Sequence, residues 1–365
     1  MKYPKYWFFL ITVILIKTLA CENVTAQQPD SVSSADINYA VGADLSFLKS
    51  AEDRGVEFKE NGEVKPGLDI FRDHGYNWIR LRLFHSPDRL PNDLEYTIEL
   101  AKEAQEHGFK FLLDYHYADS WADPGKQPIP AAWDTTNVEV LIDSVYQYTK
   151  NTIEAFREAG VMPEMVQIGN EVRNGMLWPL GKLPGNWDNF AGLFKAGLDG
   201  IDAGRGQAPR PLIMLHYDNG ADTKGAKQFY DKFNSYNIPY DIIGLSYYPW
   251  WHGNLLQLRE NMLSLVENFN KDIILVETGY RPHEYEDHPA PYSEDIPGGP
   301  RKAFLEDVNE TLLNISSRKI KGIFWWEPAS GCGSDYFGEE CNVRPVINVF
   351  DKYKRGKTGE DDVPQ

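Results

Sequence analysis

The chain has 365 residues, of which 25% are charged and 42% hydrophobic, a composition typical of a folded globular protein rather than a disordered or fibrous one. With 37 basic and 54 acidic residues, the formal net charge is -17. This charge argues against a nucleic-acid-binding protein, because such proteins depend on clustered Lys and Arg. Aromatic residues make up 13% of the chain, an excess that suits sugar binding as well as a core, because apolar sugar faces stack on flat rings.

The N-terminus has the order of a signal peptide. Two lysines precede the apolar run Trp7–Ile16, and the small residue Ala20 stands before Cys21. The run is too short for a good transmembrane helix, and no later apolar stretch approaches ~20 residues. Leu19–Cys21 resembles the cleavage box of bacterial lipoproteins, although Thr18 stands where a larger aliphatic residue is usual. The alternative is an ordinary cleavage site followed by an incidental cysteine.

The chain therefore divides into a signal peptide of lipoprotein type (residues 1–20), a polar tether (21–37), a folded domain (38–352) and a polar C-terminal tail (353–365). If Cys21 is lipidated, the protein is exported and anchored at the bacterial outer membrane or cell surface, and it contacts the membrane only through the lipid. A secreted or periplasmic protein is the alternative. Cys332 and Cys341 lie close together in a Gly-rich loop, where they could form a disulfide or remain two free thiols.

From about residue 38, short apolar runs alternate with helical patterns eight times. We expect strands at Tyr39–Asp44, Trp78–Leu83, Lys110–Tyr115, Met165–Asn170, Leu212–His216, Ile242–Tyr247, Ile273–Glu277 and Ile320–Trp326. Helical patterns lie between them, for example at Leu94–His107, Val138–Ala159, Phe190–Ala203 and Arg301–Ser317. Unbroken alternation predicts an α/β protein with parallel strands, and eight units predict a single closed (β/α)8 TIM barrel. A doubly wound open sheet is the alternative, but Gly42–Leu45 is not the phosphate-binding glycine turn that it would need.

Two glutamates stand at the carboxyl ends of predicted strands, on the face that carries the active site in barrel enzymes. Glu171 closes strand four directly after Asn170, and Glu277 closes strand seven. These strands face each other across the mouth of an eight-stranded barrel, so the two carboxyl groups can converge. Glycoside hydrolysis needs such a pair, one to protonate the leaving oxygen and one to face the anomeric carbon. Either glutamate taken alone could instead form a salt bridge at the rim.

Sequence motifs accompany the predicted strands along the chain. They are GADLSFL (Gly42–Leu48), NWIRLRLF (Asn77–Phe84), LLDYHYADSWADPGKQ (Leu112–Gln127), QIGNEVRNGMLWP (Gln167–Pro179), LHYDNG (Leu215–Gly220), VETGY (Val276–Tyr280) and FWWEPA (Phe324–Ala329). In this order they resemble the motifs of glycoside hydrolase family 53, the endo-β-1,4-galactanases, within the clan of retaining barrel glycosidases with Glu on strands four and seven. The D-Y-H-Y-x-D-x-W-A-D-P run within them is the most family-specific, whereas Asn-Glu marks only the clan.

The resemblance implies endo-acting hydrolysis of β-1,4-galactosidic linkages in galactan and type I arabinogalactan, by a retaining double displacement. Glu171 matches the acid/base and Glu277 the nucleophile. Asn170 matches the residue that binds the sugar 2-hydroxyl. Arg80 and Tyr247 are expected to keep the nucleophile ionised and oriented.

The resemblance also implies substrate-binding residues. Trp326 would lie under the sugar at the cleaved bond. The remaining candidates are His116, Trp121, Asp123, His216 and Asp218. The histidines with nearby aspartates could instead bind a metal, but no close ligand spacing such as H-E-x-x-H is present, so we expect no metal in the site.

We expect a monomer that acts on polysaccharide and requires no cofactor. Some bacterial relatives hold a structural calcium in the last barrel loops. The acidic stretch His283–Asp295 could supply oxygen ligands for one, although it has no regular ligand loop. Two other functions stay open at this point: a related endo-glycanase, such as a β-1,4-mannanase or xylanase, and a non-catalytic surface glycan-binding protein.

Overall fold

The computed structural model describes residue 1 and residues 37–282 and 290–354, and within them eight parallel strands close into a barrel. The strands are β1 (Ala40–Asp44), β4 (Trp78–Leu83), β5 (Lys110–Tyr115), β6 (Met165–Ile168), β7 (Leu212–Tyr217), β8 (Ile242–Tyr247), β9 (Asp272–Thr278) and β10 (Ile320–Trp325). Each strand pairs with the next, and β1 also pairs with β10 to close the ring. The predicted TIM barrel is confirmed.

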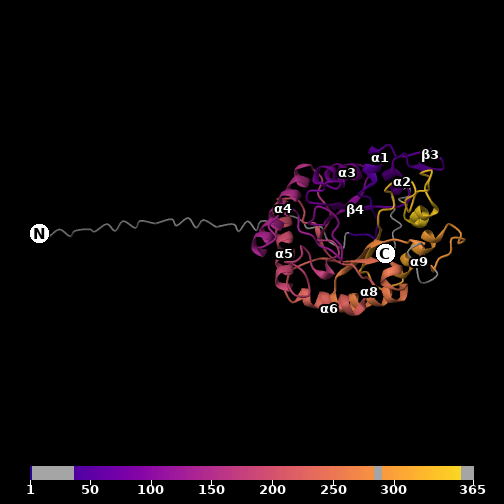
Figure 1. Ribbon diagram of the computed structural model, residues 1–365. Helices are drawn as coiled ribbons and strands as arrows, with labels where there is room; N and C mark the ends of the chain where they lie inside the picture. The colour runs from indigo at the N-terminus through magenta and orange to yellow at the C-terminus, as the bar shows by residue number, and fades with distance from the viewer. Residues whose placement is uncertain (2–36, 283–289, 355–365) are drawn as a thin grey trace.

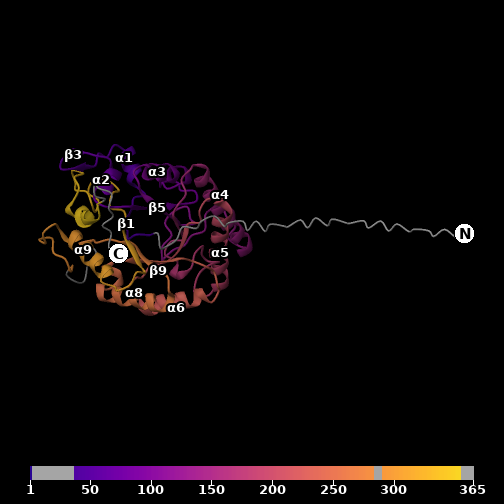
Figure 2. The same cartoon turned by 180° about the vertical axis from the view of Figure 1, so that it is seen from behind.

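Helices surround this barrel, and they follow one another around it in chain order (Figures 1 and 2). They are α1 (Leu48–Asp53), α2 (Gly67–Asp73), α3 (Leu94–Glu106), α4 (Val138–Glu158), α5 (Trp187–Gly204), α6 (Thr223–Asn234), α7 (Pro249–His252), α8 (Leu255–Phe269) and α9 (Pro300–Leu313), with the 3-10 helices η2 (Val172–Asn174) and η4 (Pro345–Tyr353). A short antiparallel hairpin of β2 (Lys59–Glu60) and β3 (Glu63–Val64) follows α1. The sequence patterns located the eight strands and the four helices that we gave as examples in the sequence analysis, with ends displaced by a few residues. The fourth predicted strand, which is β6, ends at Ile168 rather than Asn170, because Gly169 leaves the extended conformation with a φ of 79°.

The barrel interior changes character along its axis. Near the amino ends of the strands, the inward side chains form an apolar cluster separate from the core between strands and helices. Its members include Trp78, Leu112, Met165, Leu212, Ile242, Ile274 and Phe324. Since successive residues of a strand point to opposite faces, the inward residue two positions later is Arg80 on β4, Asp114 on β5 and Gln167 on β6. The interior is therefore apolar at one end and polar at the carboxyl end.

A β-bulge in β9 alters this alternation next to the mouth. Leu245 pairs with Leu275, but the following residue, Ser246, pairs with Glu277, so β9 contains one extra residue at Val276. Val276 belongs to the inward apolar cluster. Strict alternation would turn the next side chain outward, and the extra residue lets Glu277 face inward as well.

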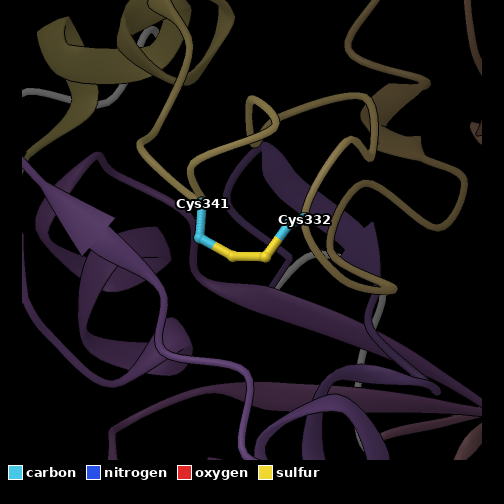
Figure 3. The surroundings of a disulfide bond; sticks show 2 residues. All are labelled: Cys332 and Cys341. Atoms are coloured by element: carbon cyan, nitrogen blue, oxygen red, sulfur yellow. A yellow bond between two sulfur atoms is a disulfide. The ribbon is translucent and has the colours of Figure 1, made fainter.

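The loop after β10 is closed by a disulfide between Cys332 and Cys341, whose Cα atoms are 4.5 Å apart (Figure 3). It lies beside β2, because the Lys59 N–H donates to the Cys341 carbonyl at 2.9 Å and the Val343 N–H donates to the Lys59 carbonyl at 2.9 Å. The loop after the last strand is thereby joined to the segment that follows the first helix.

None of the helices in residues 37–282 and 290–354 is long and apolar enough to cross a membrane. The predicted signal peptide, Cys21, almost all of the tether and most of the tail fall in residues 2–36 and 355–365, outside the described residues. These assignments stay predictions.

Candidate active site

A cavity of about 210 Å³ opens at the carboxyl ends of the strands. It is lined by Arg80, Arg82, His116, Trp121, Ala122, Asp123, Lys126, Asn170, Glu171, Glu277 and Trp326. Eight of the candidate residues from the sequence are in this lining. Three others, Tyr247, His216 and Asp218, are not.

Arg80 lines the cavity, is fully buried and contacts side chains from several strands. Its Nη1 lies 3.1 Å from Asp44 Oδ2 and 2.9 Å from Glu277 Oε2, and its Nη2 lies 2.9 Å from Asp114 Oδ2. Nη2 also donates to Asn170 Oδ1 at 2.8 Å. Burial by itself would raise the pKa of Asp114, but the Arg80 and His116 charges lower it to about 2. The buried guanidinium thus favours the ionised form of Asp114, which burial alone would disfavour.

Glu277 receives a hydrogen bond on each carboxylate oxygen. The Tyr248 hydroxyl donates to Oε1 at 2.7 Å and Arg80 Nη1 donates to Oε2 at 2.9 Å. Burial raises the pKa of Glu277 above its usual value, while Arg80 and Tyr248 oppose that rise. Both oxygens are therefore oriented by donors that favour the ionised form.

The tyrosine predicted to orient Glu277 is the wrong one of two neighbours. The Tyr247 hydroxyl donates to the Gly253 carbonyl at 2.9 Å, and its ring stacks on Phe304 of α9. Because side chains alternate along β8, Tyr247 faces the helices, and Ser246 and Tyr248 face the interior. Tyr248 takes the role that we expected of Tyr247.

Glu171 lies in a different environment from Glu277. Its backbone has a φ of 49°, a left-handed conformation that is uncommon outside glycine. Its Oε1 accepts a hydrogen bond from the Ser246 hydroxyl at 2.8 Å. Burial raises the pKa of Glu171 well above its usual value, and the charges of Glu277 and Asp218 raise it further. One oxygen of Glu171 lies within 4.8 Å of one oxygen of Glu277, so the two carboxyl groups share the cavity.

His216 and Asp218 lie behind Glu171 rather than in the cavity wall. His216 is fully buried, and its Nε2 lies 2.8 Å from Ser246 Oγ. Asp218 forms an ion pair with Arg173 at 3.0 Å. Burial raises the pKa of Asp218 to about 6, against the opposing charge of Arg173. The structure therefore places both residues as buried neighbours of Glu171 that do not line the cavity.

Within the described residues, Glu171, His216 and Glu277 have potential ligand atoms within 4.8 Å of one another, as a metal site would require. His216 does not fit this role, because its Nδ1 accepts the Glu171 N–H at 3.3 Å and its Nε2 bonds to Ser246. Both ring nitrogens are thus occupied by protein groups. The structure covers only residues 290–295 of the stretch considered for calcium, so that site stays a prediction.

Aromatic rings form one wall of the cavity. The Trp121 ring centroid lies 6.2 Å from that of Trp326 and 6.0 Å from that of His116. The Arg82 guanidinium lies 4.5 Å from the Trp121 centroid and forms a buried ion pair with Glu327. The wall thus combines aromatic rings with the buried Arg82–Glu327 ion pair, whose cation lies over the Trp121 ring.

Sequence reasoning did not assign several residues that build this site. They are Asp44, Arg82, Asp114, Gln167, Ser246, Tyr248 and Glu327. Strand periodicity was the signal that could have found most of them. Counting in twos from the apolar residues at the start of each strand leads to Asp114 and Gln167, and from Gly244 it leads to Ser246 and Tyr248.

Comparison with known proteins identifies close relatives of this arrangement. The profile of glycosyl hydrolase family 53 matches residues 40–356. The arabinogalactan endo-β-1,4-galactanase A of Aspergillus niger is 36% identical over 310 residues, which cover 82% of this chain and 87% of that protein. The protein of the same name from Emericella nidulans is 36% identical over 343 residues, covering 88% and 96%. A solved structure from work on two fungal β-1,4-galactanases superposes with a TM-score of 0.77 at 29% identity, covering 86% of this chain and 99% of that one.

The raised pKa of Glu171 predicts how stability depends on pH. A carboxyl group with a higher pKa in the folded than in the unfolded state binds a proton mainly when folded, so stability falls as pH rises between the two values. Glu171→Gln cannot ionise and removes this loss. We expect the substitution to increase the free energy of unfolding at pH 8 by at least about 1 kcal/mol more than at pH 4, since one pKa unit is worth about 1.4 kcal/mol.

Urea unfolding of the wild type and the variant at both pH values measures this difference. Glu310→Gln, at an exposed position of α9, is the matched control and should change stability equally at both. If the change in unfolding free energy between pH 4 and pH 8 were the same for Glu171→Gln and the control, the pKa of Glu171 would not be raised in the folded state.

Proposed function

Because the chain belongs to glycosyl hydrolase family 53, we propose that it is an endo-acting β-1,4-galactanase that cleaves galactan and the galactan chains of type I arabinogalactan. The observation that carries the proposal is the pair Glu171 and Glu277, two buried carboxyl groups in one cavity with oxygens within 4.8 Å of each other. The curated relatives from Aspergillus niger and Emericella nidulans carry the name of this activity.

The spacing of the two carboxyl groups supports retention of configuration. Groups about 5 Å apart leave no room for a water between substrate and carboxylate, so the carboxylate itself attacks the anomeric carbon. Glu277, with Arg80 and Tyr248 on its oxygens, is suited to be this nucleophile. Glu171, with the more strongly raised pKa, is suited to donate its proton to the leaving glycosidic oxygen.

The second step reverses the role of Glu171. Once Glu277 is esterified to the sugar it has no charge, and the repulsion that raised the pKa of Glu171 is removed. Glu171 can then accept a proton from the water that attacks the sugar–enzyme bond, and galactan ends with retained configuration are released.

Asn170 and the aromatic wall would position the substrate. Asn170 Oδ1 accepts from Arg80 at 2.8 Å and its Nδ2 donates to the Ala122 carbonyl at 2.9 Å, so the amide is fixed at the edge of the cavity for a sugar hydroxyl. Trp326 and Trp121 line the same cavity and would contact the bound sugars.

The roles of the two glutamates predict different defects. Glu277→Ala should abolish turnover of linear β-1,4-galactan, and added azide or formate should restore part of it by attacking the open face, giving a product of inverted configuration. Glu171→Ala should spare activated aryl β-galactosides, whose leaving groups need no protonation, far more than the polymer. Reducing-sugar release and product analysis measure both effects.

Mannan and xylan serve as comparison substrates and should not be depolymerised by the wild type. Hydrolysis of either in place of galactan would favour a related endo-glycanase, and no hydrolysis of any polymer would favour a glycan-binding protein. If both alanine variants kept galactan activity within about tenfold, a change of only about 1.4 kcal/mol in the barrier, the catalytic assignment would be wrong.

The neighbouring tyrosines give a matched pair of substitutions. Tyr248→Phe removes a donor to the charged nucleophile, and we expect kcat on galactan to fall roughly 10- to 100-fold, as the loss of one hydrogen bond to a charged group would produce. Tyr247→Phe removes the hydroxyl that faces Gly253 and should change kcat by less than about threefold. Steady-state kinetics of both variants distinguishes them, and equal kcat values would contradict the position given to Tyr248.

We also propose that the enzyme is lipid-anchored at the cell surface through Cys21. An endo-acting enzyme there would cut a polymer too large to cross an outer membrane into fragments small enough to import. Multiple acyl chains give stable anchoring, and the residues after Cys21 up to about 36 are polar enough to act as a tether.

Cys21→Ser tests this location. Cell fractionation should show the variant leaving the membrane pellet while its galactanase activity is unchanged. A wild-type protein that is already soluble would exclude the anchor and leave the proposed activity unaffected.

A further inference from the structure

Three hydrogen bonds connect Glu171, His216 and Ser246 in a closed ring. The Glu171 N–H lies 3.3 Å from His216 Nδ1, His216 Nε2 lies 2.8 Å from Ser246 Oγ, and Ser246 Oγ lies 2.8 Å from Glu171 Oε1. The histidine and serine are fully buried, and they come from adjacent strands, β7 and β8. The ring therefore joins three elements beneath one carboxyl group.

The protons in this ring can be placed from its donors. Two N–H groups point at His216 Nδ1, the Glu171 backbone and the Gln167 side chain, which lies at 3.0 Å. A backbone N–H can only donate, so Nδ1 is an acceptor and carries no proton. The ring proton must then be on Nε2, which donates to Ser246 Oγ. Burial lowers the pKa of His216 well below its usual value, which favours this neutral tautomer.

In this arrangement the Ser246 hydroxyl can donate its hydrogen to only one of its two neighbours. Its oxygen accepts from His216 Nε2, so its hydrogen is donated to Glu171 Oε1. An oxygen that accepts this bond is a poor site for the carboxyl proton. The proton of Glu171 is thus directed to Oε2, the oxygen that Ser246 does not contact.

From this geometry, and resting on the proposed galactanase function, we propose that Ser246 is a positioning residue for the acid/base. Its hydroxyl, fixed by His216, selects Oε2 of Glu171 as the oxygen that delivers the proton to the leaving glycosidic oxygen. It also stabilises the ionised carboxylate that forms when this proton has left, and so eases the transfer.

Other charged and titratable groups act on the same carboxyl group from the surrounding elements. They are Arg80 on β4, Asp218 after β7, Tyr248 after β8 and Glu277 on β9. Substitution of Ser246 leaves all of these in place. A change in the titration of Glu171 in a Ser246 variant can therefore be assigned to the hydroxyl.

Ser246→Ala tests the proposal through the pH dependence of kcat/KM on galactan. The alkaline limb of this profile reports the ionisation of the acid. Without a donor to the carboxylate, the ionised form is less stable, so the limb should move to higher pH by roughly one unit. At the pH optimum, we expect kcat on galactan to fall about tenfold and kcat on an activated aryl β-galactoside to fall much less, because the aryl leaving group needs no proton.

Three further variants separate positioning from a structural role. Ser246→Thr keeps the hydroxyl, so its alkaline limb should lie at the wild-type pH. Ser246→Cys replaces it with a weaker donor, so its limb should move to higher pH, as in Ser246→Ala. Thr152→Val removes a buried hydroxyl that contacts Tyr115 outside the cavity, and should lower stability without moving the limb. Thermal unfolding reports whether each variant is folded.

An alkaline limb that stays in place in both Ser246→Ala and Ser246→Cys, or equal losses on galactan and aryl substrate, would overturn the proposal. Neither result would affect the galactanase assignment, which depends on polymer cleavage by the wild type. Failure of the wild type to cleave galactan would instead remove the proposed function on which this inference rests.

Discussion

The interior of this barrel depends on one buried cation. Arg80 contacts the carboxylates of Asp44, Asp114 and Glu277 and the amide of Asn170, and so ties β4 to β1, β5, β9 and the end of β6. Isolated buried charges are strongly unfavourable, and these carboxylates are tolerated because they share a guanidinium whose two terminal nitrogens both contact acceptors. Stability and the proposed chemistry have a common origin, since the cation that permits a charged interior also favours the ionised form of Glu277, the proposed nucleophile.

The two glutamates share a cavity but differ in their partners. Glu277 has a cation and a tyrosine hydroxyl on its oxygens, whereas Glu171 has one serine hydroxyl and two acidic neighbours. Burial raises the pKa of both residues, but Arg80 and Tyr248 oppose the rise at Glu277, whereas the charges of Glu277 and Asp218 add to it at Glu171. This asymmetry comes from the elements around them: β4 and the end of β8 supply donors to Glu277, while β7 and β8 hold Glu171 through His216 and Ser246.

Much of this arrangement could be predicted from the sequence, because the signals were local. Apolar runs marked the eight strands, and their polar ends brought Glu171 and Glu277 to one rim. The role predicted for Tyr247 was wrong, because two tyrosines stand side by side at the end of β8 and only one of them faces the barrel interior. Counting every second residue from an inward position of the strand would have selected Tyr248. The bulge that turns Glu277 inward comes from pairing between strands, which no pattern within one strand records. Glu277 was predicted from its place at the end of a strand, and the family resemblance added its expected role. Neither showed that His216 and Asp218 are absent from the cavity lining.

The order in which the strands close the ring has a consequence for biosynthesis. The first strand, β1, pairs with β4 on one side and with β10 on the other, so the ribosome must make nearly the whole domain before the ring can close. Until then β1 and β9 each present an open hydrogen-bonding edge, and such edges invite pairing with other chains. A nascent chain that stops before β10 would already contain both glutamates and their donors, but it would lack the Trp326 wall and any closed barrel around them. The closed barrel that surrounds the site can therefore form only after β10 has been made.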